Sequence, residues 1–294
     1  VLNYIVRRIG YAVLILVGVN LLTFTLFFAV NSPDNIARLN IGAKRVSQDA
    51  IEKWKAERGY DKPLWFNAQA GGTAKALRCD VLDPGEVREC YEAVCRLWGP
   101  PDFLINGAGG NDPRGSTSEE FHDPQGAPAA NAQSFFVLDP AGFRHVFDLN
   151  FLGTFIATQA FSQGMVAKGA GAIVNISSMS AFTPLTKVAA YSAAKAAVSN
   201  FTHWLAVHFS RTGVRVNALA PGFFMTEQLK FLHIDQETGE LLPRARKVIA
   251  HTPMGRYGQP DDLVGTLVWL LSDASSFVTG VVVPIDGGFS SYSI

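Results

Sequence analysis

The sequence lacks the features of a nucleic-acid binder, a disulfide framework or a metalloprotein. Its 25 basic and 25 acidic residues cancel to a formal charge of zero, and lysine and arginine form no run. Only three cysteines are present, and Cys79, Cys90 and Cys95 lie at no metal-ligand spacing from a histidine. We therefore expect buried free thiols in a reducing compartment, no metal site and no nucleic-acid partner.

Charge is missing altogether from residues 9–33. As a helix, residues 9–30 would span roughly 33 Å, close to the hydrocarbon core of a bilayer at about 30 Å. A transmembrane helix over this range is the leading interpretation. It predicts a membrane-associated, single-pass protein whose membrane contact is made by residues 9–30.

Two other interpretations of this segment remain open. A buried core helix would gather its polar residues on one face, whereas Asn20, Thr23 and Thr25 are scattered. A signal peptide, including the twin-arginine type, would explain why Arg7 and Arg8 precede the run. The run is long for a signal core, however, and no small-residue cleavage site follows it cleanly.

Residues 1–67, from VLNYIVRRIGYAVLILVGVN to KWKAERGYDKPLWFN, resemble the start of bacterial dipeptide and oligopeptide ABC transporter permeases. The resemblance implies a first membrane helix followed by an external loop. No later stretch approaches the ~18 uncharged apolar residues of another membrane helix. We therefore do not expect this chain to form a permease pore alone.

From residue 74 onwards, short apolar runs alternate with longer helical segments. This alternation is typical of an α/β fold with a parallel sheet and crossover helices. Strands are predicted at 74–81, 102–106, 172–177, 214–220 and 280–286. Helices are predicted at about 83–97, 139–168, 190–211 and 260–271.

This part of the chain also carries short motifs in a fixed order. Ser178 lies 13 residues before Tyr191, which begins the pattern Tyr-x-x-x-Lys ending at Lys195. The other members are Asp80-Val81, the turn Asn106-Gly107-Ala108-Gly109, Asn150 in the long helix, and Pro221-Gly222 with Thr226. Together they resemble the short-chain dehydrogenase/reductase family over residues 72–294.

The resemblance implies an oxidoreductase that uses NAD or NADP and acts on a small carbonyl or alcohol substrate. The implied catalytic residues are Asn150, Ser178, Tyr191 and Lys195. The implied cofactor-binding residues are Asp80, Val81, Asn106, Gly107, Ala108, Gly109, Tyr191, Lys195, Pro221, Gly222 and Thr226. In this family the tyrosine donates the proton, the serine bonds the same oxygen, the asparagine holds a water, and the lysine bonds the ribose hydroxyls.

The residue types suit acid/base chemistry. Tyr191 and Lys195 are four apart on a predicted helix and so share a face, where the ammonium is expected to lower the pKa of the phenol below its usual value near 10. Taken singly, each residue is better explained by a structural role: Tyr191 as a wet hydroxyl, Lys195 as a solvated partner, Ser178 as a strand-end cap and Asn150 as a buried amide. Their joint spacing favours an active site.

Two stretches bear on the substrate. Asn106 and Asn150 are 44 positions apart, so an inserted loop is expected between them. Residues 223–263 and the C-terminal VPIDGGFSSYSI resemble the sugar-acid branch of the family, the mannonate or fructuronate oxidoreductases. Within 223–263, Arg244, Arg246 and Lys247 are candidates for a substrate carboxylate, with solvated surface charges as the alternative.

The sequence lacks the family's phosphate loop, Thr-Gly-x-x-x-Gly-x-Gly, anywhere before Asp80. The second strand, whose end distinguishes NAD from NADP, is not identifiable either. We therefore predict an incomplete Rossmann-like doubly wound parallel sheet without its first two strands, which exposes the edge of 102–106. The predicted domains are a permease-like segment at 1–71 and a catalytic domain at 72–294.

Three hypotheses follow. The chain is an NAD(P)-dependent oxidoreductase that completes its cofactor site in another way, for example as a homo-oligomer. Alternatively it is a fused or truncated remnant, anchored in the membrane and catalytically inactive. In the third hypothesis residues 1–67 are a transporter fragment with an incidental tail.

Overall fold

The computed structural model describes residues 74–124, 132–226, 229–230, 233–235 and 238–293. The chain divides into two compact units, Val1–Leu77 and Arg78–Ile294. The predicted transmembrane helix at 9–30 lies outside the described residues. Within the residues just given, no helix has the length and hydropathy needed to cross a bilayer.

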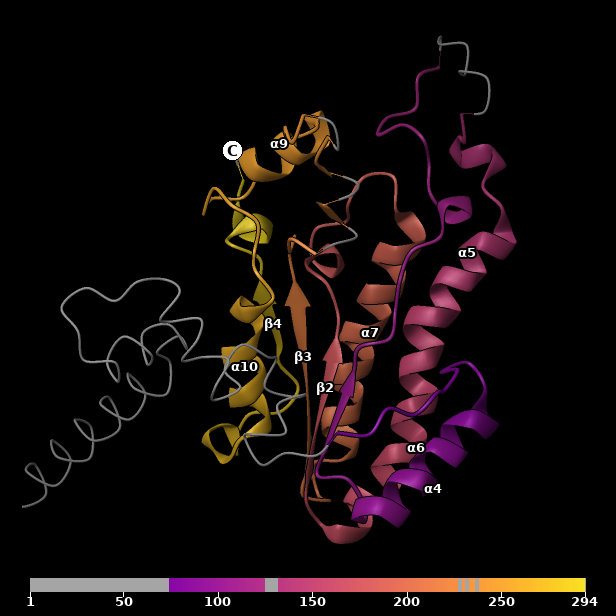
Figure 1. Cartoon of the computed structure of the whole chain (residues 1–294), viewed down its shortest axis with the longest axis vertical. Coiled ribbons are helices and arrows are strands. Elements are labelled where there is room, and N and C mark those ends of the chain that lie inside the picture. The colour runs from indigo at the N-terminus through magenta and orange to yellow at the C-terminus, as the bar shows by residue number, and fades with distance from the viewer. Residues whose placement is uncertain (1–73, 125–131, 227–228, 231–232, 236–237, 294) are drawn as a thin grey trace, which may run out of the picture. The chain divides into compact units, whose positions relative to one another are not determined.

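The second unit is built on a parallel sheet, which confirms the predicted α/β class (Figure 1). Its described strands run side by side in the order β1, β2, β3, β4, and they comprise Phe103–Asn106, Gly171–Ile176, Val214–Pro221 and Val282–Ile285. All three pairings are parallel, so the carboxyl ends of the strands meet at one edge. Four of the five predicted strands are found within two residues of their expected ends.

Helices cover both faces of this sheet (Figure 1). Helices α6 (Gly153–Lys168) and α7 (Ala189–His208) pack on one face, where Ile173 and Val216 meet Met165 and Leu205. Helix α10 (Asp261–Leu271) packs on the other face, where Val174 and Leu219 meet Leu270. Since neighbouring residues of a strand point to opposite faces, the sheet is wound on both sides.

The remaining helices lie around this core. Helix α4 (Pro84–Trp98) begins at Asp83, whose Oδ1 accepts from the backbone N–H groups of Gly85 and Glu86. This start agrees with the helix predicted from about residue 83, because the carboxylate satisfies donors that have no partner within the helix. Helix α5 (Pro140–Phe147) has the same kind of start at Asp139, and α9 (Pro243–Ala250) lies near the carboxyl ends of the strands (Figure 1).

The long helix predicted at 139–168 is interrupted in the middle. A wide π-helical turn, Asp148–Leu152, joins α5 to α6. Inside this turn, Asn150 Nδ2 donates to the carbonyl of Val146 at 2.8 Å. The side chain of Asn150 thus supplies a donor to a helix carbonyl at the point where the regular bonding pattern changes.

The strand predicted at 74–81 was wrong, because residues 74–80 belong to no strand. The chain turns into α4 instead, with the backbone N–H of Asp80 donating to Glu86 Oε2 at 2.8 Å. Within the described part of the chain, β1 is therefore an edge strand. Its Phe103 and Ile105 are 52% and 46% exposed, in line with the expected open edge.

Candidate active site

The four candidate catalytic residues gather at the carboxyl end of the sheet. Ser178 follows β2 by two residues, and Tyr191 and Lys195 lie in the first two turns of α7. Asn150 lies in the wide turn, which contacts α7. This end of a parallel α/β sheet is where such folds place their ligands.

Burial raises the pKa of Tyr191 above its usual value, and the nearby Ser178 hydroxyl opposes that rise. The expected lowering by Lys195 is not found. Its Nζ lies 5.6 Å from the centre of the Tyr191 ring, and Lys195 is not among the causes of the shift in the Tyr191 pKa.

Lys195 is a buried ammonium. Its Nζ donates to the carbonyl of Ile176, the last residue of β2, at 2.8 Å. Burial lowers the pKa of Lys195 to about 8. An ammonium has three N–H donors, and within the described residues Ile176 is its one hydrogen-bond acceptor, so two donors remain for a ligand.

Asn150 holds the turn that follows β1. Its Nδ2 donates to the carbonyl of Gly110 at 2.7 Å, and its Oδ1 accepts from the N–H of Gly110 at 3.3 Å. A Cβ added to Gly109 would stand 2.6 Å from Asn150 Oδ1 and 3.3 Å from Lys195 Nζ. The glycine is required here because the backbone passes directly against two of the candidate catalytic side chains.

Asn106, a predicted cofactor-binding residue, donates its side-chain amide hydrogens to other side chains of the protein. Its Nδ2 donates to Asn175 Oδ1 at 2.8 Å and to Thr158 Oγ1 at 2.9 Å. Asn175 in turn donates to Thr202 Oγ1 on α7 at 2.9 Å. This buried chain ties β1, β2 and α7 together. In the sequence, the signal for this chain is a lone asparagine, Asn175, in the apolar run AIVNIS.

Two other predicted cofactor segments lie at the same end of the sheet. A Cβ on Gly153, at the start of α6, would stand 2.9 Å from Val81, while Asp80 Oδ1 accepts from the N–H of Leu82. Beyond β3, the N–H of Gly222 donates to the carbonyl of Ile285 at 2.9 Å. A Cβ on Gly222 would stand 2.7 Å from Asp286, so this loop also requires a glycine.

Thr226, the last residue of the predicted set, caps a local turn. Its Oγ1 accepts from the N–H of Leu229 at 3.2 Å. A cavity of about 400 Å³ opens beside the same loop. Its lining includes Phe223, Arg256 and Asp286.

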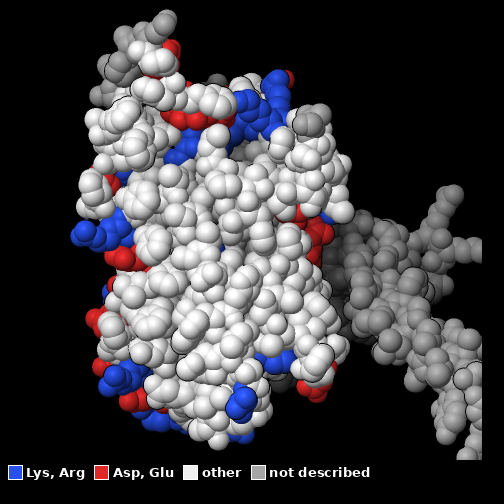
Figure 2. Space-filling view, turned by 180° about the vertical axis from the view of Figure 1, so that it is seen from behind, with Lys and Arg blue, Asp and Glu red and all other residues white. Residues whose placement is uncertain are grey.

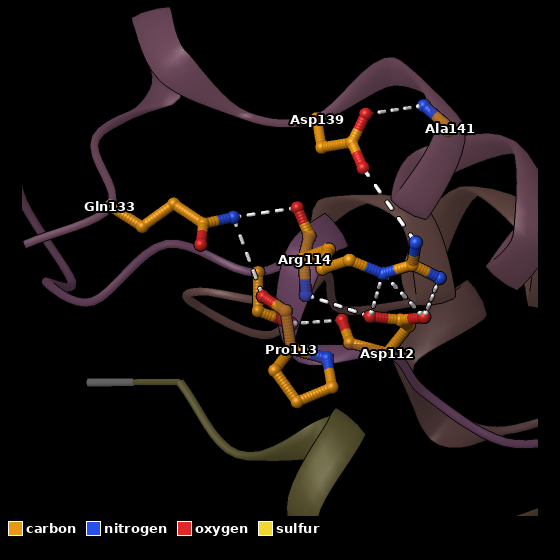
Figure 3. Close-up of polar contacts among 7 residues, drawn as sticks. Asp112, Pro113, Arg114, Gln133, Asp139 and Ala141 are labelled. Carbon is orange, nitrogen blue, oxygen red and sulfur yellow. Dashed lines mark hydrogen bonds and ion pairs between the residues drawn. The ribbon is translucent and has the colours of Figure 1, made fainter.

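The inserted loop between β1 and α5 is anchored by Arg114 (Figure 3). The guanidinium of Arg114 binds both carboxylate oxygens of Asp112 and lies 3.8 Å from Asp139. These bonds hold the pKa of Asp112 down at about 2. The side-chain amide of Gln133 donates to the carbonyl of Arg114 at 2.6 Å, so both ends of the loop meet at this arginine.

The same loop is attached to the segment before α7. The N–H of Thr117 donates to the carbonyl of Lys187 at 2.9 Å, and Lys187 Nζ donates to the carbonyl of Ser118 at 2.5 Å. Lys187 has a φ of 72°, a left-handed conformation unusual for a residue other than glycine. It lies four residues before Tyr191, so the inserted loop is fastened about one turn from the candidate acid.

Two models of known protein families match this chain. A family model described as enoyl-(acyl carrier protein) reductase matches residues 61–290. The N-terminal part of the membrane component of binding-protein-dependent transport systems matches residues 1–70. The two matches overlap over residues 61–70.

Individual relatives cover most of the chain. UxuB of Bacillus subtilis strain 168, an uncharacterized oxidoreductase, is 51% identical over 245 residues, which is 83% of this chain and 86% of that protein. A crystal structure with bound NAD, described as a candidate D-mannonate oxidoreductase of Haemophilus influenza, is 46% identical over 84% of each chain, with a TM-score of 0.72.

The structure of a third relative contains NADP instead of NAD. The gluconate 5-dehydrogenase of Burkholderia cenocepacia, solved with NADP and tartrate, is 28% identical over 84% of each chain, with a TM-score of 0.63. The sheet, the ordered motifs and these matches agree. The chain belongs to the short-chain dehydrogenase/reductase family of oxidoreductases, and its first 70 residues resemble a transport-system membrane component.

Proposed function

We propose that the chain interconverts a carbonyl and a secondary alcohol on a sugar acid, with NAD or NADP as the hydride carrier. One observation carries the proposal. Ser178, Tyr191 and Lys195 form a buried polar cluster, and Asn150 holds the adjoining glycine turn against it. Such a cluster at the carboxyl end of a parallel sheet is suited to moving a proton at a substrate oxygen.

Tyr191 acts as the acid in the direction of carbonyl reduction. Its raised pKa keeps the phenol protonated at neutral pH, so a proton is available for the carbonyl oxygen. The Ser178 hydroxyl donates to the same oxygen and fixes its position. In the direction of alcohol oxidation, Tyr191 must first lose its proton before it can accept that of the alcohol, so its raised pKa favours carbonyl reduction at neutral pH.

The site suits the nicotinamide ribose end of the cofactor, which supplies or accepts the hydride when bound. The two remaining donors of Lys195 match a pair of ribose hydroxyls. Gly107 adds to the fit, since no described atom lies within 4 Å of the position of an added Cβ. The pyrophosphate end does not fit as well, since no glycine-rich phosphate motif precedes Asp80 in the sequence.

The sugar-acid substrate is supported by the names of relatives. Mannonate and gluconate, the substrates in two of those names, are six-carbon hydroxy acids. Both pair a carboxylate with several hydroxyl groups. A substrate of this kind offers the secondary alcohol that Tyr191 and Ser178 are placed to bind.

We also propose a single-pass membrane anchor at residues 9–30, with domains at 1–71 and 72–294. The proposal rests on the charge-free run and on the match of residues 1–70 to a membrane component. A homo-oligomer is proposed from a different feature. Figure 2 shows a broad face with few charged side chains. Helices α6 and α7 also expose the large apolar side chains of Phe155, Trp204 and Val207.

Two alternative functions keep specific support. The missing phosphate motif favours an inactive, membrane-anchored remnant, and the match of residues 1–70 favours a transporter fragment. Cofactor binding separates them from the proposed enzyme. A chain that binds neither NADH nor NADPH is not an enzyme of this type, whatever its catalytic residues.

The test uses the full chain, purified in detergent. NADH and NADPH fluorescence titrations come first, followed by the oxidation of NADH or NADPH in the presence of fructuronate. We expect Tyr191→Phe to lower kcat by about 10²- to 10⁴-fold, because it removes the hydroxyl group that donates the proton and keeps the aromatic ring. Tyr91→Phe, a change on α4, serves as the control and should leave kcat unchanged. Absence of cofactor binding in the unmodified chain would refute the proposal.

A further inference from the structure

The backbone of Lys187 is held in an unfavourable conformation close to the candidate site. Its φ is 72°, whereas the other described residues with a positive φ are glycines. A side chain in this left-handed region costs free energy, because its Cβ crowds a neighbouring carbonyl oxygen. Such strain persists only where surrounding contacts hold it, and it is common at functional sites. The contacts of Lys187 should therefore show what the strain is for.

Two hydrogen bonds hold Lys187 against the inserted loop. Its carbonyl accepts from the N–H of Thr117 at 2.9 Å, and its Nζ donates to the carbonyl of Ser118 at 2.5 Å. The backbone and the side chain of one residue thus bind two consecutive residues of the loop. This double contact accounts for the left-handed conformation, since it depends on the direction in which the backbone of Lys187 faces.

The bound part of the loop connects its outgoing and returning arms. The N–H of Ser118 donates to the carbonyl of Gln133 at 2.9 Å, and the N–H of Gln133 donates to Ser118 Oγ at 2.8 Å. The side chain of Gln133 then reaches the carbonyl of Arg114 (Figure 3). A change at Lys187 should therefore displace both arms together.

On its other side, Lys187 adjoins the helix that carries the candidate acid. Val188 separates it from α7, and Tyr191 follows Lys187 by four residues. Four residues of chain span at most about 14 Å. The N–H of Leu185 donates to the hydroxyl of Ser192, the neighbour of Tyr191, at 3.4 Å. Lys187 thus connects the inserted loop to the first turn of α7.

The loop and the helix joined by Lys187 differ in how firmly they are anchored. Ala190 and Ala194 of α7 are fully buried, and Lys195 of the same helix bonds to the end of β2. Thr117 of the loop is half-buried, and Ser118 is exposed. Loss of the contact should therefore move the loop and leave the helix, with its tyrosine, in place.

The loop is also tied to α9, on the side away from α7. Lys247 Nζ lies 2.9 Å from Glu120 Oε2, and the side chain of Lys247 is 72% exposed. An ion pair this open to water contributes little to stability. Lys187, with one contact from its backbone and one from its side chain, is the firmer of these two attachments.

We propose that Lys187 is a positioning residue, which holds residues 117 and 118 beside the start of α7 as one wall of the sugar-acid site. The inference rests on the proposed function, because it takes the reacting oxygen of the substrate to lie at Tyr191. Lys187 itself does not touch the substrate. It keeps the loop in place before the substrate arrives, and a ligand that must first order a loop binds more weakly.

Substrate affinity tests this role separately from turnover. D-Mannonate is titrated calorimetrically into the full chain, purified in detergent, in the presence of NADH, which cannot oxidise an alcohol. Lys187→Met removes the ammonium and keeps much of the apolar stem. The Kd for mannonate should rise about tenfold, as expected if the loop occupies its binding position about a tenth of the time. In fructuronate reduction, KM should rise with it while kcat changes less than about twofold, because saturating substrate restores the loop.

Four further variants separate positioning from folding. Lys187→Arg keeps a donor for the carbonyl of Ser118 and should restore most of the affinity. Lys187→Gly relieves the left-handed φ, so its Tm should exceed that of Lys187→Met, yet mannonate should still bind weakly. Lys168→Met is the matched control, because Lys168 Nζ also donates to a carbonyl, that of Pro101 at 3.2 Å, before β1. It should leave the Kd unchanged, and Glu120→Gln should raise it only slightly.

Amide hydrogen exchange shows whether the loop itself is released. The N–H groups of Thr117 and Ser118 should exchange faster in Lys187→Met than in the unmodified chain or in Lys168→Met. Unchanged exchange would mean that Lys187 does not hold the loop. Faster exchange with an unchanged Kd would mean that the loop is no wall of the site. Either result overturns the inference, as does an equal loss of affinity in Lys168→Met.

Failure of the inference and failure of the proposed function give different results. If the unmodified chain does not bind mannonate, the inference fails, while turnover of another carbonyl compound with NADH would still support hydride transfer. If mannonate binds and Lys187→Met weakens it, but the unmodified chain turns over no carbonyl compound, the proposed function fails and the role of Lys187 in binding stands.

Discussion

Strands β1 and β2 are neighbours in one sheet, yet their surroundings differ sharply. Residues 172–175 of β2 are buried, whereas Phe103 and Ile105 of β1 are largely exposed. Beyond β2 and β3 lie the side chains that would move the proton. Beyond β1 lies the glycine turn that Asn150 holds. The side of the proposed site at β2 is therefore more deeply buried in the described structure than the side at β1.

The largest expected difference between the two strands is in the free energy of unfolding, and alanine substitution of one isoleucine on each strand tests it. Ile173 of β2 is fully buried against α6 and α7, so Ile173→Ala should lower the free energy of unfolding by about 2–5 kcal/mol. Ile105→Ala on β1 should cost about 1 kcal/mol or less, since nearly half of that side chain is exposed. Denaturant unfolding of both variants measures the difference. Equal losses would mean that the β1 edge is covered.

A second pair of variants changes two glycines in the turn after β1. Gly109→Ala places a methyl group against Asn150 and Lys195, and overpacking of this kind should cost about 1–3 kcal/mol. Gly107→Ala meets open space two residues earlier and should be close to neutral in the absence of cofactor. Thermal unfolding compares the two variants. A stable Gly109→Ala would show that the turn is not held against Asn150.

The smallest effect concerns pH. Burial lowers the pKa of Lys195 from 10.5 to about 8, so between these values the unfolded chain binds a proton that the native chain has released. Raising the pH in this window therefore opposes unfolding. Lys195 should add about 1 kcal/mol of stability between pH 8 and pH 9. Unfolding at both pH values should show this gain in the unmodified chain and its loss in Lys195→Met. An identical pH dependence would place Lys195 in water.

Local patterns were enough to predict much of this fold. Asp83 and Asp139, each followed by proline, correctly marked helix starts, because a cap acts only on the next few residues. The apolar runs that became β1 to β4 were found for a similar reason. The run at 74–81 failed, since a strand also requires a neighbouring strand, and sequence pattern carries no information about that partner.

The sequence correctly predicted that Ser178, Tyr191 and Lys195 lie close together, and it wrongly predicted the direction of the Tyr191 pKa shift. Spacing brought Ser178, Tyr191 and Lys195 together, yet the pKa of Tyr191 is raised rather than lowered because burial dominates. Contacts between distant segments were invisible in the sequence. The pair Glu120 and Lys247, 127 residues apart, and the amide chain from Asn106 to Thr202 depend on how the loops and helices pack.

The wide turn at Asp148–Leu152 has a consequence for how this protein tolerates change. Each residue of a helix rotates its successors by about 100°, and the wide turn holds one residue more than a regular turn would. It therefore sets the phase between α5, which packs on the inserted loop, and α6, which packs on the sheet. A single deletion here would turn the buried faces of Thr154 and Thr158 away from β1. Residues 140–168 should consequently tolerate substitutions at exposed positions better than any change in length.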